Sequence, residues 1–240
     1  MNKNVSLVPV NECSGCGLCS FVCPSGAIRF LYDPDGFLNP DIDHTKCTNC
    51  GICLQRCPVI SSRRDNGNFS LPEALVCWHK DDETVRRSSS GGVFSALAEY
   101  CLGKKGTVYG AVWCDDLSVR HKRVEDSCDI ALLRGSKYVQ STMEHIYVSV
   151  ANDLKNGRLV LFSGTPCQIA GIQSINDNKP SNLFTCEVIC HGVVSAIIFN
   201  AYVKYMENMS NAKIRRIDFR YKSNCNWEKF SVKLFLTRKK

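Results

Sequence analysis

The sequence predicts an α+β, ferredoxin-like domain in residues 1–60 and an α/β domain with a mixed sheet in residues 71–240. Three observations support this division. Two cysteine-rich motifs with the same spacing lie near the N-terminus. Residues 61–70 are polar and show no periodicity, as expected of a linker. Beyond them, strand-like and helix-like segments alternate, which is typical of an α/β domain.

Both cysteine motifs read C-x2-C-x2-C-x3-C-P; the first begins at Cys13 and the second at Cys47. This is the spacing that holds cubane 4Fe-4S clusters. Glycines between the cysteines allow the backbone to curl closely around such a cube. Structural zinc usually uses separated cysteine pairs or Cys/His mixtures, and disulfides belong mainly to secreted proteins. The doubled motif therefore predicts two 4Fe-4S clusters.

In two-cluster ferredoxins, the fourth cysteine of each run ligates the other cluster. We therefore expect crossed ligation. The first cluster site would comprise Cys13, Cys16, Cys19 and Cys57, and the second cluster site would comprise Cys47, Cys50, Cys53 and Cys23.

Between the runs, the sequence Asp-Pro-Asp-Gly at residues 33–36 predicts a turn. The apolar segments 27–31 and 59–60, one after each run, predict short helices and small β-hairpins around the cluster loops. So small a unit, hereafter the cluster domain, buries little apolar surface, and the clusters would hold it together.

Composition predicts a cytoplasmic protein. The two motifs use half of the 16 cysteines, and no run approaches the ~20 apolar residues of a direct membrane span. The N-terminus has no apolar signal core, so the thiols are expected to be reduced. The net charge is +7, but residues 1–60 hold four Lys/Arg and five Asp/Glu, so they carry −1 and the rest of the chain carries +8. A basic surface suits a phosphate-bearing cofactor or an acidic partner. No nucleic-acid-binding motif is present, so no nucleic-acid partner is expected.

The α/β domain is expected to contain strands at residues 73–78, 107–114, 119–124, 158–162 and 183–189. Helices are expected at residues 93–102, 127–133, 143–156 and 195–209, several closed by glycines. Residues 214–221 and 230–236 predict two antiparallel strands. A two-strand flap at a terminus is poorly supported, so the sequence is expected to be truncated.

Three loops could carry chemistry. Residues 88–92, Ser-Ser-Ser-Gly-Gly, precede a helix and could bind an anion or serve only as a flexible cap. Pro166 fits the first helical position, so Cys167 would lie in the first turn, where the helix dipole favours a thiolate. Such a thiolate could ligate a metal or attack as a nucleophile, although a buried structural cysteine is the alternative. Cys190 and His191 end a strand, but adjacent residues there point in opposite directions and should not form a dyad.

Four ordered segments of the chain, residues 88–97, 134–140, 162–171 and 190–193, resemble the family of coenzyme F420 hydrogenase/dehydrogenase beta subunits over residues 71–240. Many members also carry an N-terminal two-cluster segment. The resemblance implies a flavoprotein-type module that binds FAD and passes electrons between iron–sulfur clusters and the flavin. Some members also exchange hydride with the deazaflavin coenzyme F420, and the resemblance extends this expectation to the present chain.

By position, the resemblance implies cofactor-binding roles for Ser89, Ser90, Gly91, Gly92, Val93, Gly135, Ser136, Lys137, Tyr138, Gln140 and Thr165. Cys167 and Cys190 match positions that ligate a further 4Fe-4S cluster in the family, where the other two ligands usually come from a downstream cysteine pair. Only Cys225 follows Cys190 here, so Cys167 and Cys190 are expected to be a partial set of ligands, and this chain is expected to hold no third cluster. No catalytic residue is assigned.

These observations predict an iron–sulfur flavoprotein oxidoreductase, or a subunit of one, with electrons entering through the cluster domain. A flavin converts between one-electron clusters and two-electron hydride chemistry. The alternative is a non-catalytic ferredoxin-type electron carrier or docking subunit. Either function requires a redox partner protein or another subunit. An enzyme with a cysteine nucleophile is disfavoured, because no motif places a base beside Cys167 or Cys190.

Overall fold

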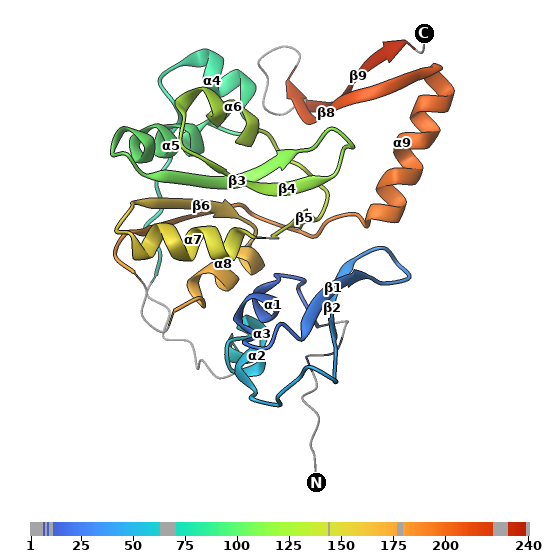
Figure 1. The fold of residues 1–240 in the computed structure, drawn as a ribbon. Coiled ribbons are helices and arrows are strands. Elements are labelled where there is room, and N and C mark those ends of the chain that lie inside the picture. The colour runs from blue at the N-terminus through green and yellow to red at the C-terminus, as the bar shows by residue number, and fades with distance from the viewer. Residues whose placement is uncertain are drawn as a thin grey trace.

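The computed structural model describes residues 7, 9, 12–62, 71–143, 145–176, 180–222 and 230–238. The predicted linker therefore lies mostly outside the described residues, as does Cys225. Figure 1 shows the cluster domain below a sheet with helices on both of its faces.

The cluster domain contains three short helices and one hairpin: α1 (Leu18–Val22), β1 (Ile28–Tyr32), β2 (Leu38–Ile42), α2 (Ile52–Gln55) and α3 (Pro58–Ser62). Gly17 and Gly51 precede α1 and α2 with φ of 88° and 74°, a conformation that favours glycine. β1 and β2 are antiparallel, and the Asp33 carboxylate accepts a hydrogen bond from the Phe37 amide at the predicted turn. The apolar segment 59–60 lies in α3, which begins at Pro58, so the described residues of this domain form a single hairpin.

The elements of the α/β domain are α4 (Asp82–Arg87), α5 (Val93–Gly103), β3 (Thr107–Trp113), β4 (Val119–Val124), η1 (Ser127–Asp129), α6 (Ile130–Leu133), β5 (Ser141–Thr142), α7 (Ile146–Lys155), β6 (Val160–Gly164), α8 (Pro166–Gln173), β7 (Leu183–Glu187), α9 (Ala196–Ser210), β8 (Ala212–Lys222) and β9 (Phe230–Arg238). The strand order of the central sheet is β5-β4-β3-β6-β7. β3 and β4 are antiparallel and the other pairs are parallel, so the predicted mixed sheet is confirmed.

Two cores cover the faces of this sheet. On one face, α5 and α6 pack with Val108 and Val112 of β3. On the other, α7 and α8 pack with Tyr109 of β3 and Phe162 of β6. Alternation along β3 explains the division, because successive side chains point to opposite faces. Leu18 of α1 belongs to the second core, so the cluster domain packs on the side of α7 and α8 (Figure 1).

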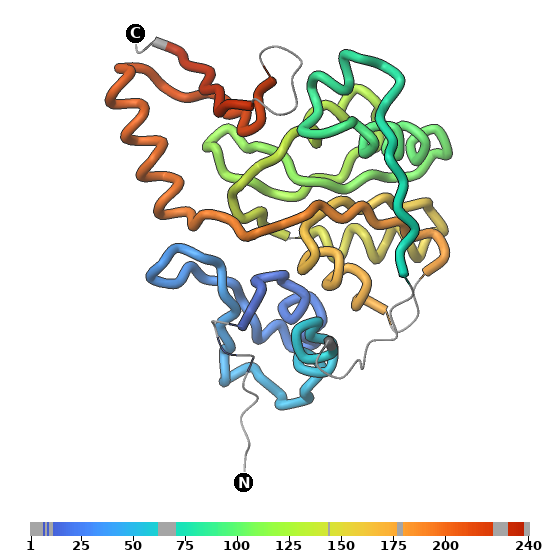
Figure 2. Tube along the Cα trace, turned by 180° about the vertical axis from the view of Figure 1, so that it is seen from behind, coloured from blue at the N-terminus to red at the C-terminus, as the bar shows by residue number. Residues whose placement is uncertain are grey.

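The last elements lie beyond the edge of the sheet. Figure 2 shows the chain between β7 and α9 crossing the molecule beside the cluster domain. β8 and β9 pair in the antiparallel manner that the sequence predicts. A third core joins Phe199 of α9 and Ile217 of β8 to Val119 of β4, which holds the hairpin against the sheet.

The prediction of a strand at residues 73–78 is wrong. These residues lie outside the sheet and are exposed: Val76 is 93% and Trp78 70% accessible. The segment is held instead by the His79 amide, which donates to the Gly91 carbonyl (2.7 Å). The next residues form α4, which the sequence did not predict and which Asp81 caps by accepting from the Thr84 amide.

Candidate cluster and cofactor sites

The eight cysteines of the two motifs surround two hollows in the cluster domain. Cys13, Cys16, Cys19 and Cys57, together with Cys53, line the first hollow. Cys23, Cys47, Cys50 and Cys53 line the second. The fourth cysteine of each run therefore lies with the first three of the other run. This placement supports crossed ligation, although the ligand assignment itself stays a prediction.

The electrostatics of the first cluster site fit a bound cation. Burial raises the pKa of Cys13, Cys16 and Cys19, and neighbouring thiolates raise these pKa values further. Thiolates grouped in a half-buried hollow need compensating positive charge, which the iron ions of a cluster would supply. An all-cysteine donor set is also the usual one for 4Fe-4S clusters.

At the second cluster site, the pKa of one thiol is raised and the pKa of another is lowered. Burial also raises the pKa of Cys53, and the thiolates of Cys23 and Cys50 add to this effect. For Cys23, slight burial is outweighed by hydrogen bonds that the sulfur accepts from Ser25 and from the Ala27 amide, which lower the pKa of the thiol. This thiol would therefore lose its proton to a metal more readily than the buried ones.

Tyr147, in the first turn of α7, ties the first cluster site to the α/β domain. Its hydroxyl donates to the Cys16 carbonyl (2.7 Å), and its ring stacks on Phe21 with centroids 5.5 Å apart. Burial raises the pKa of Tyr147 well above its usual value, and the thiolates of Cys16 and Cys167 raise it further. The hydroxyl is therefore a protonated donor at the boundary between the domains.

A second contact joins the hairpin of the cluster domain to the α/β domain. The Leu38 amide donates to Gln140 Oε1 (2.9 Å). At the hairpin tip, the Ala196 amide at the start of α9 donates to the Gly36 carbonyl (3.1 Å). Gln140, which the resemblance placed along a flavin, thus holds the cluster domain in place.

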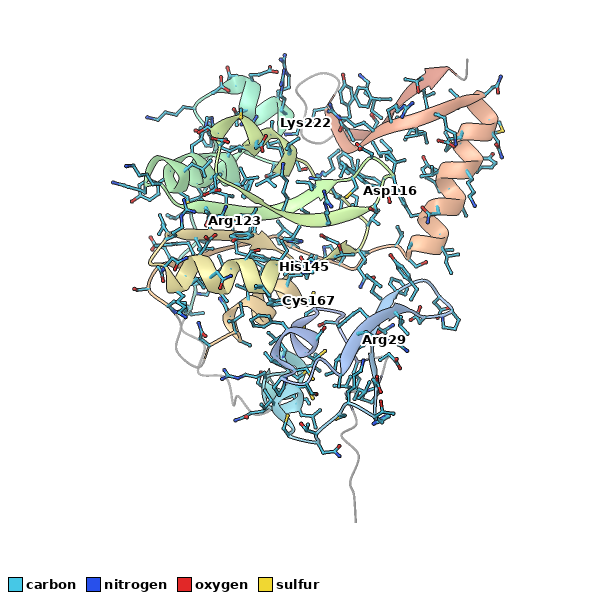
Figure 3. The ribbon with its side chains drawn as sticks, viewed as in Figure 1. Arg29, Asp116, Arg123, His145, Cys167 and Lys222 are labelled. Atoms are coloured by element: carbon cyan, nitrogen blue, oxygen red, sulfur yellow. The ribbon has the colours of Figure 1, made fainter. Side chains whose placement is uncertain are left out.

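Cys167 lies in the first turn of α8, as predicted from Pro166. Figure 3 places it on the side of the α/β domain that faces the cluster domain. Its thiolate is among the charges that raise the pKa values of Cys13 and Cys16, so it lies close to the first cluster site. Its Sγ is also 3.1 Å from Thr165 Oγ1.

Cys190, the other predicted ligand of a third cluster, is exposed in the segment after β7. Its Sγ accepts from the Gly192 amide (3.4 Å). The structure thus groups Cys167 with cysteines of the cluster domain, and the incomplete third ligand set, without a third cluster, stays a prediction.

The two segments that the resemblance placed along a flavin contact each other through Ser89 and Ser136. The amide and hydroxyl of Ser136 both donate to Ser89 Oγ (2.7 and 2.9 Å). Gly92, with φ of 79°, is the N-cap of α5. Lys222 Nζ of β8 donates to the Ser90 carbonyl (3.1 Å), so the C-terminal hairpin also reaches this loop. We call residues 88–93 together with Gly135 and Ser136 the serine–glycine loops.

Other residues of the predicted flavin set make structural contacts. Lys137 Nζ donates to the carbonyls of Leu133, Arg134 and Gly135, and burial lowers its pKa to about 8. The ring of Tyr138 lies edge-on to Phe219, with centroids 5.2 Å apart.

Gly91 and Thr165 also have local roles. A side chain at Gly91 would meet the Cys77 carbonyl (3.0 Å) and Trp78, so this glycine permits close packing of residues 77–78. Thr165 is the N-cap of α8, and its amide donates to Gln168 Oε1 (3.0 Å).

Sequence reasoning missed a buried network behind α8. His121 of β4 bonds through Nδ1 to Ser141 Oγ (2.8 Å) and donates from Nε2 to the Ser163 carbonyl (3.1 Å). Burial lowers the pKa of His121 to about 4, so the ring is neutral. Gln168 Nε2 donates to the Ser141 carbonyl, which connects the network to the first turn of α8. A single histidine within a strand pattern gave no signal of this role.

Models of protein families match three parts of the chain. Residues 12–60 match the 4Fe-4S dicluster domain. Residues 74–146 and 157–238 match the N-terminal and C-terminal parts of the coenzyme F420 hydrogenase/dehydrogenase beta subunit. These two matches together cover more than half of the chain.

Two curated relatives are similar over most of the chain. The coenzyme F420-dependent sulfite reductase of Methanocaldococcus jannaschii is 26% identical over 171 residues, which cover 70% of this chain and 26% of that protein. A subunit of the F(420)H(2) dehydrogenase of Methanosarcina mazei is 23% identical over 190 residues, 73% of this chain and 52% of that one. The chain thus spans about a quarter and about half of their lengths.

Among solved structures, the F420-reducing NiFe hydrogenase complex from Methanosarcina barkeri is similar, with a TM-score of 0.46 and 19% identity. The match covers 59% of this chain and 52% of the hydrogenase chain. Within the described residues, no helix combines the length and apolar character needed to cross a membrane.

Proposed function

The chain belongs to the family of coenzyme F420 hydrogenase/dehydrogenase beta subunits, and on this basis we propose that it is an iron–sulfur flavoprotein component of an oxidoreductase. In this proposal it passes single electrons between two 4Fe-4S clusters and an FAD. The names of both curated relatives refer to coenzyme F420, which makes this deazaflavin the first candidate for the hydride partner.

One observation carries the proposal: the first cluster site is built against the α/β domain. Its Cys16 carbonyl accepts a hydrogen bond from Tyr147, and the charge of Cys167 at the start of α8 raises the pKa of Cys16. A cluster held there would lie at the boundary that an electron must cross to reach a cofactor in the α/β domain.

The second cluster site has the opposite character. Cys50 is exposed, and Figure 1 shows the chain between β2 and α2 at the end of the cluster domain away from the sheet. We therefore assign the second cluster to exchange with a partner protein and the first cluster to exchange with the flavin.

The serine–glycine loops would hold the flavin. Ser89 and Ser136 bring the two loops together, and α5 begins immediately after Gly92. The partial positive charge at the N-terminus of a helix favours a phosphate group there. A bound flavin would supply the conversion between one-electron and two-electron transfer.

Anaerobic purification followed by counting of iron, sulfide and flavin tests the proposal. We expect about eight iron atoms per chain, as two cubane clusters require, together with FAD. Intact clusters without flavin would contradict the flavoprotein function and favour an electron carrier or docking subunit. Bound zinc without acid-labile sulfide would contradict both.

A further inference from the structure

We propose that Tyr147 is a positioning residue that tunes the reduction potential of the first cluster from across the domain boundary. This inference rests on the proposed cluster-binding function of Cys13, Cys16, Cys19 and Cys57. It adds a residue of the α/β domain, outside both cysteine motifs, to the machinery of electron transfer.

The first support is the placement of the hydroxyl. Tyr147 is 3% exposed, and its hydroxyl donates to the carbonyl of Cys16, within the loop that would wrap the cluster. The ring stacks on Phe21 and lies close to Gly17, where an added side chain would be 3.5 Å from Cε2. The tyrosine is therefore held from several sides, with its only polar group directed at the cluster loop.

The second support comes from Gly171 of α8, on the other side of the tyrosine. A side-chain carbon at this position would overlap the Tyr147 hydroxyl and would lie 3.4 Å from Cζ. Glycine in the interior of a helix is destabilising relative to alanine. Here it leaves the space in which the hydroxyl can reach Cys16.

Hydrogen bonds and dipoles around a cluster help to set its potential. The O–H of Tyr147 presents the positive end of its dipole to the Cys16 loop. A cluster gains negative charge on reduction, so this dipole stabilises the reduced form more than the oxidised form. Removal of the hydroxyl should therefore shift the potential of the first cluster to a more negative value.

The test is the variant Tyr147→Phe in the full-length protein, with redox titration followed by EPR. We expect unchanged iron content and a negative shift of one of the two cluster potentials. Tyr109→Phe is the matched control, because it removes another buried hydroxyl, bonded to Asp153 rather than to the cluster domain. It should leave both potentials unchanged. Equal potentials in wild type and Tyr147→Phe, with both clusters present, would overturn the inference.

The variant Gly171→Ala provides an independent test of the inference. In the wild-type background it should displace the hydroxyl from Cys16 and give a negative shift of the same cluster potential. In a Tyr147→Phe background the overlapping atom is gone, so Gly171→Ala should add no further shift. If Gly171→Ala shifts the reduction potential equally in both backgrounds, the effect comes from α8 itself. That result would overturn the proposed role of the Tyr147 hydroxyl.

The iron and flavin counts separate this inference from the proposed function. If the wild-type protein binds clusters but no flavin, the proposed flavoprotein function is refuted. The reduction potentials of the clusters would still decide the role of Tyr147. A wild-type protein that binds no iron after reconstitution would overturn both.

Discussion

Cys57, the last cysteine of the second motif, lies in the same hollow as Cys13, the first cysteine of the first motif. The Cys57 thiolate is also one of the charges that raise the pKa of Cys13. The two motifs are therefore interleaved, because each motif contributes cysteines to both cluster sites.

This relationship predicts which cluster each substitution damages. Cys57→Ser should impair the first cluster and lower the iron content from about eight to about four atoms per chain. Cys23→Ser is the matched variant and should impair the second cluster. Since the two clusters are in different surroundings, EPR of the reduced protein should distinguish the losses. Loss of the cluster nearer in sequence in each variant would contradict crossed ligation.

The serine–glycine loops predict the effect of an added negative charge. Ser90 is exposed and lies three residues before Val93, the first residue of α5, so Ser90→Asp should fold normally but repel a flavin phosphate. A nearby like charge costs about 1 kcal/mol in water, so flavin affinity should fall about fivefold or more. Flavin content after gel filtration measures the effect.

Ser127→Asp is the control for this prediction. It adds the same charge at an exposed position that begins another helical segment, and flavin content should not change. Equal flavin content in the two variants would refute the assignment of the flavin site to the serine–glycine loops.

The contact between Gly36 and α9 predicts how the cluster domain is held. Gly36 has φ of +84°, and a side-chain carbon there would lie 2.7 Å from Cγ1 of Ile197. Overpacking of this kind costs about 1–3 kcal/mol. Gly36→Ala should therefore release the hairpin tip, and hydrogen exchange of residues 33–42 should accelerate about tenfold.

Gly26→Ala separates this effect from backbone strain. Gly26 also has a positive φ, of +60°, but within the described part of the chain no atom beyond its two sequence neighbours lies within 4 Å of the added carbon. We expect local destabilisation in this variant without faster exchange at the hairpin tip. Equal acceleration of residues 33–42 in both variants would refute the contact with α9 as the cause.

Local signals in the sequence predicted much of the fold. β4 has the expected bounds, and Pro166 begins α8 as its fixed φ predicts. These features depend on neighbouring residues. Residues 73–78 show the limit of such reasoning, because their apolar composition suits a strand but no strand of the sheet pairs with them.

The same limit applies to the candidate sites. Cysteine spacing predicted which thiols share a hollow, because spacing controls how a short loop can wrap a cube. The roles of Gln140 and Tyr147 depend on bonds to Leu38 and Cys16, which are far away in the sequence. Such contacts form only when the two domains dock, and no local pattern reports them.

The last prediction concerns Asp153, which anchors α7 to the sheet. Its carboxylate accepts hydrogen bonds from Thr107 Oγ1 (2.9 Å), the Tyr109 hydroxyl (2.6 Å) and Arg123 Nε (2.7 Å). Burial opposes ionisation, but these bonds outweigh it and lower the pKa of Asp153 to about 2. Asp153→Asn should lower the free energy of unfolding by about 2–3 kcal/mol, less than for a fully buried pair because Arg123 is partly exposed.

The lowered pKa also sets a pH window. The unfolded carboxyl titrates near ~3.9, so the stabilisation is fully present above that value and is lost as pH falls towards about 2. Urea unfolding between pH 7 and pH 2.5 should therefore show a smaller difference between wild type and Asp153→Asn at the acid end. Asp129→Asn, which removes an exposed pair with Lys122, should cost less than ~1 kcal/mol. A difference between wild type and Asp153→Asn that is the same at pH 7 and pH 2.5 would show that the Asp153 charge does not carry the stabilisation.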